Sequence, residues 1–181
     1  PFYRGAKEPV DTIGRAVGLL GMDGLRMLVA NSVMQPVFQV PRGYFESFSP
    51  TVWRQAQHSA IAAQTYARAT RECDSFSAHL LALLFHMSHI VLFRMTVASY
   101  IQAAGALPRA DVFARLQDEC AESLAYEIAT EWELAESMSG ALAEHVQHKR
   151  VNEMSPLGRA LYFGRICGAA VVAVDDAALE E

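Results

Sequence analysis

Histidine is the residue type in this chain whose spacing is suited to chemistry. Three of the six histidines fall in residues 75–93, SFSAHLLALLFHMSHIVLF, a stretch without Asp, Glu, Lys or Arg. If the stretch is helical, His79 and His86 lie two turns apart and His86 and His89 are neighbours. Histidine binds metals and titrates near neutral pH, so this stretch can be buried and still carry reactive groups.

The other residue types favour no further enzyme class. The chain has no Gly-rich phosphate loop and no G-x-S-x-G elbow, and its three cysteines lack Cys-x-x-Cys spacing. Carboxylate pairs such as Asp118-Glu119 are typical of solvated helix faces. Trp53 and Trp132 are expected to anchor the core rather than stack on a cofactor, because each buries a large area. We therefore predict no cofactor.

Composition bounds the partners and the compartment. With 181 residues, 52% of them hydrophobic, the chain can bury the core of a single domain. Its net charge is −5 and its basic residues are scattered, which argues against a nucleic-acid partner. An odd number of cysteines without pairing patterns predicts reduced thiols and a cytoplasmic location. The start has neither an initiator Met nor a signal peptide, so we expect upstream sequence.

The uncharged stretch is predicted to be the central helix of the domain. A membrane span is the alternative, because 19 such residues approach the length that a bilayer requires. Six polar side chains are spread evenly along it, however, and each would be costly in lipid. We therefore predict a buried helix and no membrane partner.

Helical periodicity and capping signals predict helices in the rest of the chain as well. Ser49-Pro50 and Ser155-Pro156 read as helix starts, with serine as the cap and proline in the first turn. Residues 171–174 suit a strand by propensity but have no partner strand. The acidic tail, 175–181, is expected to be disordered. The predicted helices cover about residues 12–20, 23–37, 50–70, 75–93, 95–104, 111–132, 137–147 and 156–170.

Four stretches, taken in order, carry a family resemblance. The first is AVGLLGM at 16–22 with the Leu-Arg pair at 25–26, and the second runs from Trp-Arg at 53–54 to His-Ser at 58–59. The third, LLFHMSHIVL at 83–92, is similar to LLHDIGKLVL, and the fourth runs from Ala-Glu at 121–122 through Trp132 to His145. They resemble the HDOD domain family, the non-catalytic, signalling-associated branch of the HD-type phosphohydrolase superfamily.

The resemblance implies an all-α fold, a compact multi-helix bundle of HD-domain-like type. One domain would span residues 1–181 and lack the family's N-terminal helices. The resemblance also implies that the matched helices surround a vestigial pocket. The residues expected to line that pocket are His58, Phe85, His86, His89 and His145.

The chain departs from the metal-dependent pattern at two places. Phe85-His86 stands where such members carry a His-Asp pair, and the later aspartate position falls near Cys167-Gly168. Phenylalanine cannot ligate a metal, and a bridging carboxylate is needed to hold two cations. We therefore predict no catalytic residues and no metal. The alternative is a substitute metal site built from His58, His86 and His145.

The resulting interpretation is a non-catalytic regulatory module of bacterial signal transduction, and not an enzyme. It would act through a protein partner, through an adjoining signalling domain, or through a small ligand in the vestigial pocket. Two alternatives stay open: a residual metal-dependent phosphohydrolase or phosphodiesterase, and an oligomerisation domain that forms a homodimer.

Overall fold

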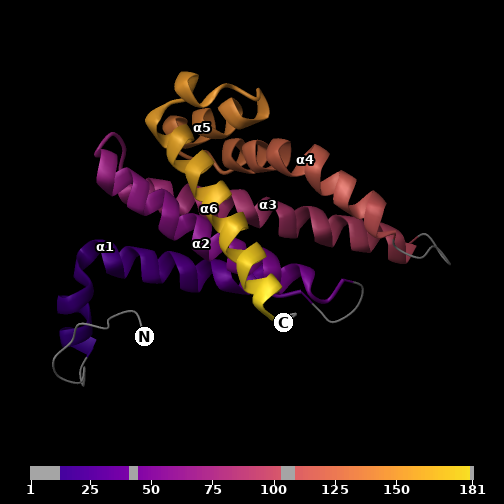
Figure 1. Cartoon of the computed structure of the whole chain (residues 1–181), viewed down its shortest axis with the longest axis horizontal. Helices are drawn as coiled ribbons and strands as arrows, with labels where there is room; N and C mark the ends of the chain where they lie inside the picture. Colours follow the sequence, from indigo (N-terminus) through magenta and orange to yellow (C-terminus); the bar gives the residue numbers. More distant parts are fainter. Residues whose placement is uncertain (1–12, 41–44, 103–108, 180–181) are drawn as a thin grey trace.

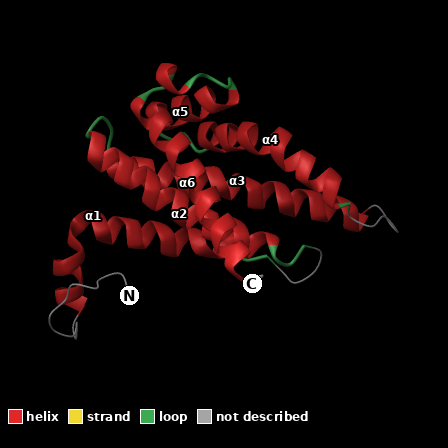
Figure 2. Ribbon diagram, in the orientation of Figure 1, coloured by secondary structure: helices red, strands yellow, loops and turns green. Residues whose placement is uncertain are grey.

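The computed structural model describes residues 13–40, 45–102 and 109–179, and every regular element in these ranges is a helix (Figures 1 and 2). The predicted all-α bundle is therefore confirmed. The elements are α1 (Ile13–Met34), the 3-10 turn η1 (Gln35–Phe38), α2 (Phe48–Thr70), α3 (Ser75–Gln102), α4 (Ala110–Glu131), α5 (Glu136–Val146), the 3-10 turn η2 (Val151–Glu153) and α6 (Pro156–Leu179).

Helix α3 is the centre of the bundle, as predicted. Every residue from Leu81 to Ser88 is buried, and α2, α4 and α6 all pack against the helix. The helix continues to Gln102 without the break that the sequence suggested before Met95. Figure 1 shows α6 crossing the neighbouring helices, while α4 and α5 lie on the far side of α3 from α1.

Within the described residues, three helices are long and apolar enough to cross a membrane, judged by length and composition alone. The segments are Val17–Phe38, Ser75–Tyr100 and Pro156–Val174. In the bundle, 56% of an 18-residue apolar window within the central segment is buried against protein. The apolar composition of α3 therefore also suits a helix enclosed by its neighbours, as the sequence analysis predicted for this stretch.

Helices α2 and α6 approach each other most closely. A Cβ added at Gly164 would lie 2.7 Å from the carbonyl oxygen of Ser59, and one added at Gly168 would lie 2.9 Å from that of Gln55. Because these distances are too short for a side chain, only glycine permits this packing. On the α2 side, Ala63 is fully buried, and its Cβ would lie 2.9 Å from a Cβ added at Gly164.

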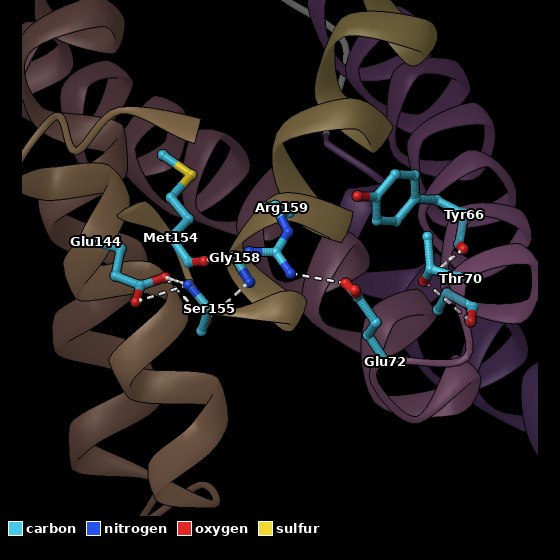
Figure 3. Close-up of polar contacts among 9 residues, drawn as sticks. Tyr66, Thr70, Glu72, Glu144, Met154, Ser155, Gly158 and Arg159 are labelled. Carbon is cyan, nitrogen blue, oxygen red and sulfur yellow. Dashed lines mark hydrogen bonds and ion pairs between the residues drawn. The ribbon is translucent and has the colours of Figure 1, made fainter. Parts of the chain in front are cut away.

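A carboxylate fixes the start of α6 (Figure 3). Glu144 of α5 accepts hydrogen bonds from the backbone N–H of Ser155, at 3.0 Å, and from its hydroxyl, at 2.9 Å. Ser155 Oγ accepts from the N–H of Gly158 at 3.1 Å, so the predicted serine cap is confirmed. Arg159 then pairs with Glu72 at 2.7 Å, which ties α6 to the α2–α3 turn.

Other helix ends agree with the sequence in part. Asp74 caps α3 by accepting a backbone N–H bond of 2.7 Å, and Gly21, with φ 67°, breaks the helical path of α1 where the first helix was expected to end. The predicted Ser49 cap is wrong. α2 already begins at Phe48, and the Ser49 hydroxyl donates instead to the carbonyl of Phe38.

Most of the acidic tail, which was expected to be disordered, is helical instead. Helix α6 continues to Leu179, so residues 175–179 are helical, and only 180–181 lie outside the described residues. Residues 171–174 belong to the same helix. Within the described ranges they have no strand to pair with, so their β-propensity is overridden.

The glycine contact gives a direct stability prediction. Gly168→Ala should lower the free energy of unfolding by about 2–3 kcal/mol, because the methyl group meets the α2 backbone. Gly140→Ala is the matched control: it lies in α5 with open space around it, and should raise stability by roughly 0.5–1 kcal/mol. Urea titration of the wild type and both variants measures these changes in unfolding free energy. Equal effects would show that α2 and α6 are farther apart than described.

His79 links α3 to α1. The Asn31 side-chain N–H donates to His79 Nε2 at 2.9 Å, and the same amide nitrogen donates to the carbonyl of Met27 at 2.8 Å. His79 must therefore be neutral, with its proton on Nδ1. Burial, assisted by the charge of Arg68, lowers the pKa of His79 to about 4.

This shift predicts acid sensitivity. Because the unfolded chain binds the proton near pH 6.5 and the folded chain only near pH 4, stability is lost as pH falls through that window. The loss attributable to His79 reaches about 3 kcal/mol. His79→Gln, which cannot titrate but keeps a side-chain amide, should make the plot of unfolding free energy less steep between pH 6.5 and 4, while His86, His89 and His145, whose pKa values burial also lowers, keep part of the slope. An unchanged slope would contradict the assignment.

Candidate functional site

An open pocket of about 690 Å³ lies where α3, α4, α6 and the end of α5 meet. α3 contributes Phe85, His86 and His89, and α2 contributes only Gln55. Aromatic, imidazole, carboxylate and cationic groups share this space. The residues from the other elements are Asp118, Glu122, His145, His148, Lys149, Met154, Tyr162, Arg165, Ile166 and Ala169.

Arg165 is the central group of the pocket. Its Nη2 lies 2.6 Å from Glu122 Oε1, and its Nη1 lies 3.0 Å from His145 Nδ1. The guanidinium carbon sits 4.1 Å from the centroid of the Phe85 ring, in cation–π geometry. One cation therefore contacts α3, α4 and α5 from its own position on α6. Arg165 and Glu122 are 30% and 23% exposed, so solvent only partly screens the pair.

The hydrogen bonds of His145 define its protonation. Its Nε2 lies 3.1 Å from the carbonyl oxygen of Gly158, so this nitrogen donates. Nδ1 then carries the lone pair, and this lone pair accepts the N–H of Arg165. In a metal site such a lone pair would be a ligand. Here it is already used by the guanidinium.

The two α3 histidines of the pocket are also held by neighbours. His89 Nδ1 donates to Gln117 Oε1 at 2.9 Å, since Gln117 presents its N–H to the His89 carbonyl. His86 Nε2 bonds Ser59 Oγ at 2.8 Å, while its Nδ1 is buried without a hydrogen-bond partner. The Phe85 ring meets both imidazoles edge-on, with centroids 5.4 and 5.5 Å apart.

The pocket favours neutral imidazoles. Burial lowers the pKa of His86 well below its ordinary value, and the neighbouring His89 and Arg165 lower it further. Burial also lowers the pKa of His89 and of His145, and the charge of Arg165 acts in the same direction on both. The resident positive charge is therefore Arg165, and the histidines serve as hydrogen-bonding groups around it.

The structure brings together four of the five residues that the sequence proposed for the pocket. Phe85, His86, His89 and His145 all line it. His58 does not: it is half-buried on α2, and Gln55, one turn earlier, lines the pocket instead. His58, His86 and His145 therefore do not form one metal site. Within the described ranges, no group of three His, Cys, Asp or Glu side chains has the arrangement of a metal site.

Arg165 and Glu122 are the site residues that sequence reasoning missed. A signal was present, since Arg159 and Arg165 are the only charges between Leu157 and Val174. An arginine in an otherwise apolar helix needs a partner, and here the partners are Glu122 and His145.

The resemblance implies an aspartate position near Cys167-Gly168, and the structure shows tight packing at Gly168. Gly168 faces Ser59 and the α2 backbone so tightly that no side chain fits there. Ser59 in turn holds His86. A carboxylate at this point would require α6 to move away from α2.

Together, the bundle and its central histidine-bearing helix are those of an HD-like helical domain. The family model of the HDOD domain matches residues 1–148, and the chain belongs to this family. The match confirms the resemblance carried by the motifs, and α6 with Arg165 follows the matched segment. No curated protein and no solved structure matches the chain.

The Phe85–Arg165 contact can be tested with a double-mutant cycle. Phe85→Ala should cost about 3–5 kcal/mol of unfolding free energy, because the ring is 2% exposed. Phe85→Asp should cost no more, since its carboxylate would face the Arg165 guanidinium instead of being buried alone. Adding Arg165→Met to each variant should lower the unfolding free energy of the Phe85→Asp protein more than that of the Phe85→Ala protein. If chemical denaturation shows that Arg165→Met costs both variants the same unfolding free energy, Arg165 does not contact position 85.

Proposed function

We propose that this HDOD domain is a non-catalytic regulatory module that works by binding and not by hydrolysis. The observation that carries the proposal is the cation–π contact of Arg165 with Phe85, together with the hydrogen bonds that Arg165 makes to Glu122 and His145. A protein side chain supplies the pocket's positive charge. It cannot deliver a hydroxide as a bound metal ion does.

The residues of the pocket do not fit the divalent ions that HD-type hydrolases use. Glu122 is paired with Arg165, and the lone pair of His145 points to the same guanidinium. A second cation would meet the charge of Arg165 without a carboxylate at position 85 or 168 to offset it. Asp118 lines the pocket but is exposed, and a lone solvated carboxylate is a weak ligand set.

The module would signal in two ways: through contacts that its surface makes with other proteins or domains, and through a ligand bound in the pocket. The pocket is open and lined by aromatic, imidazole, carboxylate and cationic side chains, so it suits a small ligand. A protein partner or an adjoining signalling domain would read the state of the bundle, in a cytoplasmic setting. The alternative function is an oligomerisation domain that forms a homodimer. Measuring the protein's mass over a range of concentrations distinguishes this homodimer from a monomer.

The proposal predicts no turnover. Freshly purified protein should hydrolyse neither aryl phosphates nor cyclic mono- and dinucleotides with manganese, iron(II), zinc or magnesium, because no pair of ions can be held. His145→Ala and Glu122→Gln are measured beside the wild type, after circular dichroism has shown that both fold. Activity that persists in both variants comes from a contaminant. Metal-dependent activity that both variants abolish would overturn the proposal and establish the residual hydrolase.

A further inference from the structure

The C-terminal end of α4 exposes two large aromatic side chains outside the pocket. Tyr126 is 38% exposed and Trp132 is 56% exposed. The expectation that both tryptophans anchor the core is therefore wrong for Trp132, whereas Trp53 packs partly buried against Phe38. The two exposed aromatics line a hollow on the surface, called here the α4 hollow. Its residues are Tyr126, Glu127, Ile128, Thr130, Glu131 and Trp132.

The backbone around Trp132 is fixed even though its side chain is exposed. Its N–H donates to the Ile128 carbonyl at 3.0 Å, and the N–H of Leu134 donates to the Ala129 carbonyl at 3.0 Å. Glu133 has φ 51°, so the chain turns sharply there. An aromatic held on an ordered backbone loses little entropy when a partner covers it, and exposed tryptophan and tyrosine are typical of binding hot spots.

The charge around the α4 hollow selects the kind of partner. Residues 110–136 contain eight Asp and Glu and a single basic residue, Arg115, which pairs with Glu119 at 3.8 Å. Among the ion pairs of the described residues, none uses Glu127 or Glu131. The helix dipole adds further negative potential at this end of α4. The eight acidic residues are Asp111, Asp118, Glu119, Glu122, Glu127, Glu131, Glu133 and Glu136.

We propose that the α4 hollow is a docking site for a cationic segment of a partner protein. A Lys or Arg side chain of that segment lies on the Trp132 indole, where the ring attracts a cation. Glu127 and Glu131 supply the opposite charge beside it. The inference extends the proposed protein-binding role to a surface separate from the Arg165 pocket, so its failure would leave the absence of hydrolysis untouched.

The test uses a fluorescein-labelled peptide of four Arg-Ala repeats, with a Glu-Ala peptide of equal length as the charge control. The whole chain should bind the arginine peptide, with an affinity that falls as salt rises. Trp132→Ala should weaken binding by about tenfold, and Glu127→Gln with Glu131→Gln by a similar factor. Fluorescence anisotropy gives the dissociation constants, and circular dichroism checks that each variant folds.

Two matched controls separate docking from general charge attraction. Glu119→Gln removes an acid of the same helix that is already paired, and Met95→Ala removes another exposed apolar side chain, 57% exposed. Both should leave the affinity within about twofold. The proposal is overturned if the arginine peptide does not bind at millimolar concentration. It is equally overturned if the Glu-Ala peptide binds as well, or if Glu119→Gln weakens binding as much as Trp132→Ala.

Discussion

The close approach of α2 and α6 is the constraint on which the site depends. Gly164 and Gly168 let α6 lie directly against the α2 backbone at Gln55 and Ser59. This contact sets the height and rotation of α6, and hence the point at which Arg165 enters the pocket. The same contact leaves no room for a carboxylate at position 168. The same close contact thus determines both the side-chain size allowed at position 168 and the place from which Arg165 reaches the pocket.

A guanidinium and a metal ion stabilise a pocket by different means. A metal is exchangeable, and its affinity depends on deprotonated ligands and on supply. Arg165 is covalently attached and is charged at any physiological pH, so the pocket is complete as soon as α6 docks. The Phe85 ring fits this arrangement, because it offers a cation an attractive face without the desolvation penalty of a buried carboxylate. A phenylalanine in the place of a ligand is therefore consistent with its surroundings.

Periodicity, capping residues and family motifs predicted the helices and most of the pocket. They failed where the answer depends on helix rotation or on the reach of a long side chain. α2 is buried on two sides, so its pattern does not say whether Gln55 or His58 turns toward α3. Arg165 reaches its partners through tertiary packing across 43 positions of sequence to Glu122. Trp132 was misplaced because the size of a side chain alone does not decide its burial: this residue follows the last residue of α4 and is 56% exposed.

Arg165 of α6 connects the pocket to α3, α4 and α5 through its ring contact and its hydrogen bonds. Four helices meet at this side chain, so a ligand that drew Glu122 away would leave the guanidinium with only His145 and Phe85. The free energy of binding in the pocket is then linked to the seating of α4, and the linkage is reciprocal. Glu122 and Tyr126 lie one turn apart on α4, and a helix moves largely as a rigid rod over such a distance. The proposed partner, bound at the exposed end of α4, would therefore act on the helix that anchors the pocket's cation.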